Sequence, residues 1–491
     1  MTRLFTTICS PLFFCIALAA IPACESLGSH GELPRVAERG QARPNGLTDD
    51  AGAPAATADR HWATVREAGD MTSDANQHAA AVFAREPEVR IVFNQGGGHG
   101  NQRASLTVIE RLEKIGFRGH YFILAANGTL ERTLSLIRDF FSVHPELDQK
   151  RFSYEVKAGK HVRYAMTGAL DTPQPGMNRL ASADQLIVIQ PTDWNSGPGY
   201  HVIDGPGEMQ ANYGPPLNAN GRSDMALACF CSLPEEKIDD VFERSKLGSG
   251  DNKYLRELVD RMMRRAIDVQ VVYGLHNETT PGAISAVDML SRLLGAYHRL
   301  RVTGALPRPV VVLVMSNDFN PQPLSARFPH LVTLHGGVPE PSALKPNDVK
   351  LAVIPMLPFP VFDALLQWTS LPPLVEGANS RNVIKETRRT GFMQAVRLKG
   401  TEDSSQATAQ AASPKGHALF IAAQNGLAAS PGSQSGMTEG DAMTAVADFL
   451  RAYVSNAPEL HTYFETWFEH FRNRPDTFLA ATAAICDDDS T

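Results

Sequence analysis

The sequence predicts an α/β protein with two domains, each built on a parallel β-sheet. Three observations indicate this class. Short runs of β-branched and apolar residues alternate with stretches of helical apolar spacing from residue 89 onward. A glycine-rich turn separates the first such strand from the first helix, and polar loops follow several later strands. The chain has 491 residues, 43% hydrophobic and 20% charged, which is typical of a globular protein of about two or three domains.

Charge and cysteine usage narrow the classes of partner. The formal net charge of −7 argues against a general polyanion binder, because phosphate contacts need clustered Lys and Arg. The short basic run of Arg261, Arg264 and Arg265 is interpreted as a solvated helix face, so we expect no nucleic-acid partner. The six cysteines include no CxxC pair, which argues against a structural zinc site. The sequence has no run of about 20 apolar residues, which argues against a multi-span membrane protein.

The first 24 residues have the length and shape of a secretory signal peptide. A basic start is followed by an apolar stretch at 12–21 that is too short for a spanning helix. The end of this segment also resembles a bacterial lipoprotein box, in which Cys24 would carry a lipid, although Pro22 departs from that pattern. The alternatives are an irregular apolar leader or a wrongly chosen start codon. We expect a secreted protein or a lipoprotein if residues 1–24 are a signal, and a cytoplasmic protein otherwise.

The strongest local signal is a strand, a glycine turn, a helix and a second strand. Val89–Asn94 and His120–Ala125 are strand-like, and an apolar helical repeat between them begins at Leu106. Such a βαβ unit implies a parallel sheet. The turn could bind a ligand, because glycines allow close approach and the helix N-terminus presents N–H groups and partial positive charge. Its candidate binding residues are Gly96, Gly97, Gly98, Gly100 and Asn101, and the alternative is that the glycines only make the turn. The spacing is neither a Walker loop nor GxGxxG, which argues against ATP and NAD.

The segment Phe93–Asn101 resembles the N-terminal glycine loop of GT-B glycosyltransferases, including the lipid-sugar and MurG-type enzymes, although the order of His and Gly differs. In that family the loop lies between two Rossmann-like domains, near the acceptor and the donor diphosphate. The resemblance therefore implies an α/β protein with two Rossmann-like domains facing across a cleft. It also makes His99 a candidate for the catalytic base or for a group that positions the acceptor, since an imidazole exchanges protons near neutral pH. The alternative is a loop histidine that only shapes the turn.

Further candidate residues follow other predicted strands. Asp193 comes after the strand at 186–190 and could act as a general base, or it could simply form a turn. In the second half, Asn317 and Gly336 fall in loops after strands and are candidate ligand contacts. Strands are expected there at 269–273, 309–315 and 331–334, and a helix at 284–294.

A later segment occupies the place, in chain order, of the family's ribose- and diphosphate-binding segment. Glu376 could accept hydrogen bonds from ribose, and Gly377 frees the backbone. Asn379 or Ser380 could cap a helix whose N–H groups suit a diphosphate, or could cap and nothing more. Arg381 could offset phosphate charge. The family's Glu-x7-Glu motif is not found in this sequence.

The C-terminal part is expected to hold loops at 400–416 and 428–440, a last strand at 417–423, and helices at 442–454 and 460–471. Phe464, Trp467, Phe468 and Phe471 share one helical face, which indicates packing. The GT-B resemblance implies that such a helix crosses back onto the first domain. The predicted segments are a leader at 1–24, a flexible leader at 25–86 with one helix near 57–84, an acceptor-side domain at 87–265, a nucleotide-sugar domain at 266–440 and C-terminal helices at 441–491.

Together these patterns favour transfer of a sugar from a nucleotide-sugar donor to an unknown acceptor, which could be a protein, a glycan or a lipid. Helix N-termini and arginines could stabilise the leaving diphosphate, so we expect neither a metal nor another cofactor. One alternative is an exported, non-catalytic binding protein or lipoprotein of the virulence-factor type. Another is a sugar-nucleotide epimerase, because the same fold supports both reactions. Membrane contact is expected only through a lipid at Cys24.

Overall fold

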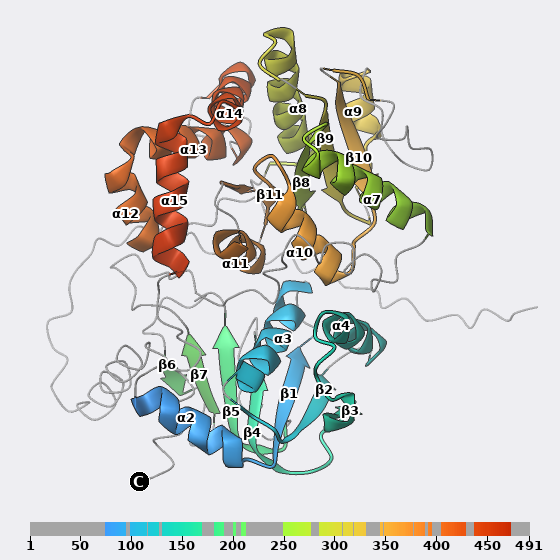
Figure 1. Cartoon of the computed structure of the whole chain (residues 1–491), viewed down its shortest axis with the longest axis vertical. Helices are drawn as coiled ribbons and strands as arrows, with labels where there is room; N and C mark the ends of the chain where they lie inside the picture. Colours follow the sequence, from blue (N-terminus) through green and yellow to red (C-terminus); the bar gives the residue numbers. More distant parts are fainter. Residues whose placement is uncertain are drawn as a thin grey trace, which may run out of the picture. The chain divides into compact units, whose positions relative to one another are not determined.

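The computed structural model of the protein describes residues 74–94, 99–114, 116–126, 130–168, 181–190, 200–202, 208–212, 249–275, 284–306, 308–317, 319–329, 344–346, 348–376, 378–387, 391–394, 404–428 and 437–472. All of them belong to one compact part of the chain, Ala53–Thr491. They form two β-sheets with flanking helices, and a group of helices near the end of the chain (Figure 1). None of the helices in these ranges is both long and apolar enough to span a lipid bilayer.

The first sheet has seven strands in the order β3-β2-β1-β4-β5-β7-β6. All neighbours pair in parallel except β6 and β7. The strands are β1 (Glu88–Asn94), β2 (His120–Ala126), β3 (Phe152–Glu155), β4 (Val162–Thr167), β5 (Ala183–Gln190), β6 (Tyr200–Val202) and β7 (Glu208–Asn212). The helices of this part are α2 (Asp74–Arg85), α3 (His99–Lys114) and α4 (Leu130–Val143), with a 3₁₀ turn at Gln149–Arg151.

The predicted βαβ unit is confirmed. β1 and β2 pair in parallel along their full length, from Glu88 opposite His120 to Asn94 opposite Ala126, and α3 connects them. Val89, Ile91 and Phe93 pack with the apolar face of α3, whereas Val92 packs in a second cluster on the other face of the sheet. Burial on both faces explains why the strand is almost continuously apolar.

Helix α2 falls inside the range predicted as a leader. Phe83 of α2 is fully buried in the core of the first sheet, and its ring lies 5.4 Å from that of Tyr164. The last residues before β1 therefore pack against the first sheet.

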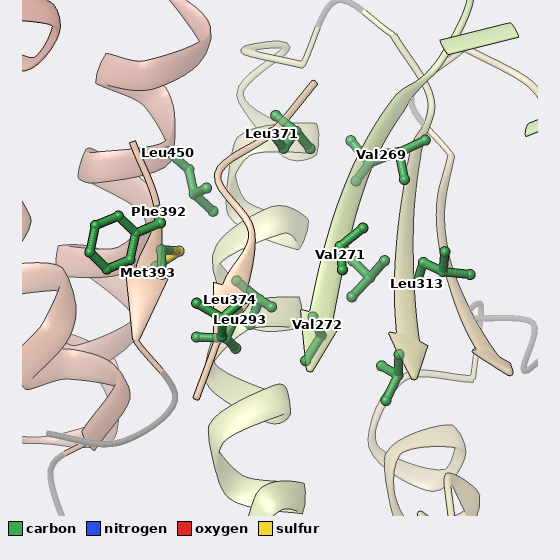
Figure 2. Close-up of a cluster of buried hydrophobic side chains, with 14 of the residues drawn as sticks. Val269, Val271, Val272, Leu293, Leu313, Leu371, Leu374, Phe392, Met393 and Leu450 are labelled. Carbon is green, nitrogen blue, oxygen red and sulfur yellow. The ribbon is translucent and has the colours of Figure 1, made fainter. Parts of the chain in front are cut away.

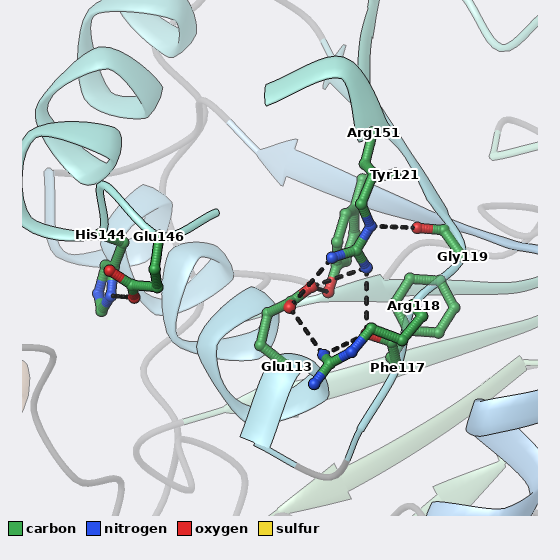
Figure 3. A network of polar contacts seen from close by, with 8 residues as sticks. All are labelled: Glu113, Phe117, Arg118, Gly119, Tyr121, His144, Glu146 and Arg151. Carbon is green, nitrogen blue, oxygen red and sulfur yellow. Dashed lines mark hydrogen bonds and ion pairs between the residues drawn. The ribbon is translucent and has the colours of Figure 1, made fainter. Parts of the chain in front are cut away.

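A polar network holds the C-terminal end of α3 (Figure 3). Glu113 accepts hydrogen bonds from the Tyr121 hydroxyl at 2.7 Å and from Arg151 at 3.1 Å, and forms ion pairs with Arg151 at 2.8 Å and Arg118 at 3.2 Å. Burial, together with the charge of Glu113, raises the pKa of Tyr121 well above its usual value, so this hydroxyl stays a donor. The network fixes α3 against the start of β2 and the 3₁₀ turn, and this in turn fixes the direction of its opposite, N-terminal end.

The second sheet has five parallel strands in the order β10-β9-β8-β11-β12. They are β8 (Asp268–Tyr273), β9 (Val310–Met315), β10 (Val349–Ile354), β11 (Leu374–Val375) and β12 (Met393–Gln394). The helices are α7 (Ser249–Met263), α8 (Ala286–Val302), α9 (Gln322–Arg327), α10 (Phe359–Trp368) and α11 (Ala378–Thr387). Among the described strands, both sheets contain the 3-2-1-4-5 order of doubly wound α/β folds. The protein is therefore α/β with two parallel-sheet, Rossmann-like units. The first unit contains the seven-stranded sheet, and the second unit contains the five-stranded sheet.

The core of the second unit lies around β8 and α8 (Figure 2). Gln270 is the one polar side chain within the apolar run 269–273, and it is fully buried. Its amide donates to the Pro372 carbonyl at 2.7 Å and accepts from the Tyr297 hydroxyl at 2.8 Å, so both polar ends are satisfied. This pairing links the central strand to α8 and to the segment before β11.

Four helices end the described chain: α12 (Ser404–Ala412), α13 (Pro414–Ala428), α14 (Glu439–Val454) and α15 (Pro458–Arg472). The expected strand at 417–423 is wrong, since these residues lie inside α13. Phe420, Ala423 and Leu427 recur at helical spacing and are buried in the core of the second unit. The expected loop at 400–416 is also wrong, because α12 and the start of α13 fall within it. Its Ala- and Gln-rich sequence favours helix, and Ala409 is buried.

The aromatic stripe of α15 packs as predicted, but its position differs from the one implied by the family resemblance. Phe464, Trp467 and Phe468 are buried in the same cluster as Phe392, which precedes β12, and Phe420 of α13. Phe464, Trp467 and Phe468 therefore contribute to the core of the second unit, whereas the side chain of Phe471 and residues 473–491 lie outside the described part of the chain.

Candidate functional site

One pocket lies at the carboxyl end of the second sheet and has a volume of about 280 Å³. The second unit contributes Tyr273, the last residue of β8, the segment between β10 and α10, and Ser380 in the first turn of α11. The first unit contributes residues of α3 and α4. The complete lining is Arg103, Arg132, Ser135, Leu136, Asp139, Tyr273, Met356, Leu357, Pro358, Phe359, Phe362 and Ser380.

The pocket lies where the order of strands reverses. In the second sheet β8 is flanked by β9 on one side and by β11 on the other, so the helices that follow β8 and β11 leave on opposite faces. Tyr273 ends β8 and Ser380 follows β11, which places both at this switch point. In open α/β sheets, ligands bind in the crevice at such a point.

The residues of α4 share one helical face. Arg132, Ser135, Leu136 and Asp139 are spaced by three, four and seven residues, so their side chains project in one direction. The adjacent face of α4, including Ile137 and Phe140, is buried in the core of the first unit. The apolar face therefore orients the helix, and the polar face is directed to the pocket.

A buried ion pair joins the two units beside the pocket. The Arg103 guanidinium of α3 donates to the carboxylate of Asp363 on α10, and their side chains are 9% and 0% exposed. The same guanidinium lies 5.6 Å from the centre of the Phe359 ring, which allows a cation–π contact. The pair fixes the position of Arg103 at the pocket wall.

Tyr273 lies among charged groups on the opposite wall. Its ring is 4.8 Å from that of Phe362, and its carbonyl accepts the backbone N–H of Glu376 at 3.1 Å. Burial raises the pKa of the Tyr273 hydroxyl, the Glu376 carboxylate raises it further, and Arg103 and Arg132 oppose this. The hydroxyl is therefore neutral at physiological pH, and both arginines lie close enough to act on it electrostatically.

Gly274 permits the approach of Glu376 to β8. Its φ of +88° is in the left-handed region, and a Cβ at this position would lie 2.1 Å from the Cβ of Glu376. Any other residue would displace the segment that leads from β11 to α11.

Asp139 is the acidic residue of the pocket wall. Burial raises the pKa of its carboxyl group from 3.8 to about 6, and the charge of Arg138 limits the rise. Among the described residues, no group of three or more His, Cys, Asp or Glu side chains is arranged to hold a metal ion.

The structure brings a part of the predicted site together. Ser380 lines the pocket, and half-buried Glu376 lies beside Tyr273. Arg381 is 2% exposed and is absent from the pocket lining. Asn317 is exposed, and its side chain accepts the backbone N–H of Met356, a residue of the pocket wall.

The other predicted site residues are described in part or not at all. His99, Gly100 and Asn101 form the first turn of α3, and Asn379 belongs to the first turn of α11, but the side chains of these residues lie outside the description. Gly96, Gly97, Gly98, Asp193, Gly336 and Gly377 lie outside the described residues, as does the predicted strand at 331–334. α3 and α11 are in contact, so the helices that follow the two predicted loops do approach each other.

Sequence reasoning missed Arg103, Arg132, Asp139 and Tyr273. Arg103 carried a usable signal, because it stands in the second turn of a helix that follows a glycine loop. Arg132 and Asp139 carried none, since charged residues on an amphipathic helix normally mark the solvated face.

No family model matches the sequence, and no curated protein does. Among solved structures, the chain is similar to an alpha-glucosyltransferase in complex with UDP and a 13-mer DNA containing a central A:G mismatch, at 11% identity and a TM-score of 0.37, over 80% of this chain and 97% of that one. It is also similar to a glycosyl transferase of family 9 from Veillonella parvula, at 9% identity and a TM-score of 0.29, over 64% and 80% of the two chains. Both TM-scores lie below 0.5, so the function of this chain has to be argued from its own residues.

Proposed function

We propose that the protein transfers a sugar from a nucleotide-sugar donor to an acceptor, and that the donor diphosphate binds in the pocket at the end of β8. The observation that carries this proposal is the composition of the pocket. One wall is the switch point of a Rossmann-like sheet, and the other presents two arginines from the neighbouring Rossmann-like unit. We further infer that the two units face each other across this pocket, as the domains of GT-B enzymes do.

The charges suit a diphosphate leaving group. The first turn of α11 carries Ser380 at the pocket, and the free N–H groups of a helix N-terminus attract phosphate oxygens. Arg132 adds positive charge from the first unit, whereas the charge of Arg103 is offset by its pairing with Asp363. Groups of this kind stabilise the charge that develops on a departing diphosphate. The proposal needs no metal ion for this step.

The apolar part of the wall suits a nucleoside. Tyr273, Phe359 and Phe362 are aromatic, and Met356 and Leu357 extend the apolar surface. Small-molecule sites are mostly apolar, with a few polar groups that fix orientation, and they begin at roughly 300 Å³. The pocket's volume of about 280 Å³ is close to that lower bound.

The predicted loop residues complete the proposal. His99 stands at the first position of α3, directly after the glycine turn, where it could position the acceptor hydroxyl. Asp193, Gly336 and Gly377 stay predictions from the sequence. The identity of the acceptor, the absence of a nucleic-acid partner and the export signal at 1–24 stay predictions as well.

Nucleotide binding gives the first test. UDP and GDP should raise the melting temperature of the purified protein by mass action, by an amount corresponding to about 2.7 kcal/mol at 100 times Kd. Arg132→Ala should weaken UDP binding by about 10- to 100-fold, as expected for a lost charge-assisted hydrogen bond. The matched control is Arg264→Ala, because this side chain is 75% exposed and pairs with Asp260 on its own helix. A loss of affinity of the same size in both variants would contradict the proposed site.

Turnover separates the alternatives. Release of UDP from UDP-glucose, or of GDP from GDP-mannose, is expected for a transferase that uses water as a poor acceptor. Interconversion of the sugar without a transferred product would indicate an epimerase. The absence of any effect of nucleotides on the melting temperature would favour the exported, non-catalytic binding protein.

A further inference from the structure

The pocket-facing side of α4 carries three polar side chains beside the buried, apolar Leu136. Arg132, Ser135 and Asp139 line the pocket from this helix, and α4 contacts α10 of the second unit. An interface between helices would normally place apolar residues here. Three polar side chains at the same wall indicate that this face is built to meet a polar ligand.

The Asp139 carboxylate is not engaged elsewhere. Within the part of the chain that the structure describes, its side chain forms neither a hydrogen bond nor an ion pair, although it lines a pocket that holds two arginines. By contrast, Asp363 in the same region is taken up by Arg103. The lone pairs of the Asp139 carboxylate are therefore available to accept a hydrogen bond or a proton from a ligand in the pocket.

The charged groups around Asp139 come from several elements. Arg132 and Arg138 belong to α4, Arg103 comes from α3 and is paired with Asp363 of α10, and Tyr273 ends β8. The Tyr273 hydroxyl is neutral, because its pKa is raised by burial.

Burial outweighs the charge of Arg138 and brings the pKa of Asp139 to about 6. A group with such a pKa is ionised at neutral pH and is a stronger proton acceptor than an ordinary carboxylate.

The two walls of the pocket carry residues with different proposed roles. Ser380 at the N-terminus of α11 and Tyr273 at the end of β8 lie on the proposed donor side. Asp139 lies on the wall contributed by the first unit, so a sugar bound between the walls would have the carboxylate on the side away from the second sheet. An acceptor hydroxyl would have to approach the anomeric carbon from that side.

We propose that Asp139 is the general base that takes the proton from the acceptor hydroxyl. This inference rests on the proposed function. The acceptor oxygen forms a bond to the anomeric carbon while its proton passes to the Asp139 carboxylate. The bond between the anomeric carbon and the diphosphate oxygen breaks, and the nucleoside diphosphate leaves with the electron pair. In donor hydrolysis, water takes the place of the acceptor. His99 then has a positioning role only.

The test is the pH dependence of donor hydrolysis, with UDP-glucose and GDP-mannose as probes. In the wild type, kcat/KM should fall as the pH drops through about 6, because the base becomes protonated. Asp139→Asn should lower kcat by at least about 100-fold and remove the acidic limb of the profile, while UDP still raises the melting temperature as in the wild type. Asp139→Glu should recover a part of the rate. The control is Asp184→Asn, an exposed carboxylate of the same unit that contacts His161, which should leave rate and profile unchanged.

The outcomes separate this inference from the proposed function. If UDP and GDP bind neither the wild type nor Asp139→Asn, both proposals fail. If nucleotides bind and donors are hydrolysed, but Asp139→Asn keeps its rate or its acidic limb, the assignment of Asp139 alone is overturned. A rise in KM with unchanged kcat and pH profile would show a purely structural role and would overturn the assignment too. If nucleotides bind and no donor is hydrolysed, the carboxylate does not activate water and the assignment fails.

Discussion

Single substitutions of Arg103 or Asp363 should destabilise the protein by more than the ion pair between them contributes to its stability. Asp363 is fully buried and Arg103 is 9% exposed, so removing one partner leaves the other as a desolvated charge. Breaking such a pair costs about 3–5 kcal/mol. With a total stability of about 5–15 kcal/mol, Asp363→Leu or Arg103→Met alone should remove a large part of it.

Replacing both partners should cost much less. Arg103→Met together with Asp363→Leu removes both charges and keeps apolar volume, and such replacements are often neutral or stabilising. Urea unfolding followed by circular dichroism measures the free energy of unfolding of the wild type, the two single variants and the double variant. The coupling energy from this cycle should be on the order of 3 kcal/mol or more.

An exposed pair provides the comparison. Arg451 and Asp448 on α14 lie 2.8 Å apart with side chains that are 49% and 46% exposed, so the same cycle there should give about 0.5 kcal/mol or less. If the two single effects at Arg103 and Asp363 simply add up in the double variant, the two side chains do not interact as described. The two units would then not be joined by a buried ion pair at this position.

Two further predictions concern single side chains. The folded-state pKa of Asp139 is raised to about 6, so its contribution to stability is complete below pH 4 and is lost as the pH rises through 6. Between pH 4.5 and 7.5 the Asp139→Asn variant should therefore gain stability relative to the wild type, by about 1 kcal/mol after a discount for the partial exposure of Asp139. Urea unfolding at several pH values measures this difference. A loss of stability relative to the wild type over this range would contradict the raised pKa. Gly274→Ala should lower the free energy of unfolding by roughly 1–3 kcal/mol more than Gly304→Ala does. Both glycines have positive φ, but only at Gly274 would the new Cβ meet Glu376, and equal losses would argue against that contact.

The fold could be predicted where parallel strands are buried on both faces. Val89–Phe93 is a short run that is apolar except for the buried Arg90, Pro309–Met315 is continuously apolar, and β1 and β9 are found at these positions. The same rule failed at 417–423, because a short apolar run fits a strand and a buried helix equally well. There the decision depends on α15 and α14, which α13 contacts in the folded chain. The sequence does not show those contacts.

The candidate site could be predicted only where it follows a strand directly. Ser380 belongs to a strand–turn–helix segment, and local sequence is enough to place it at the end of a parallel sheet. Arg103 acquires its role from Asp363, 260 residues further along the chain. Asp139 faces the pocket only because α4 packs against α10. Such long-range packing depends on the arrangement of the two units, which no local pattern encodes.

The shared aromatic interior of α13, α15 and the segment before β12 has a practical consequence for anyone who shortens the chain. Phe392 contacts Trp467, and Phe420 contacts Phe464, so the last helices pack their aromatic side chains against the second sheet. A shortened protein ending before residue 404 would lack Phe420, Phe464 and Trp467, so Phe392 would be exposed to water and the protein should aggregate on expression. Boundaries for producing the second unit by itself should therefore fall beyond Arg472, even though the pocket residues end nearly a hundred positions earlier.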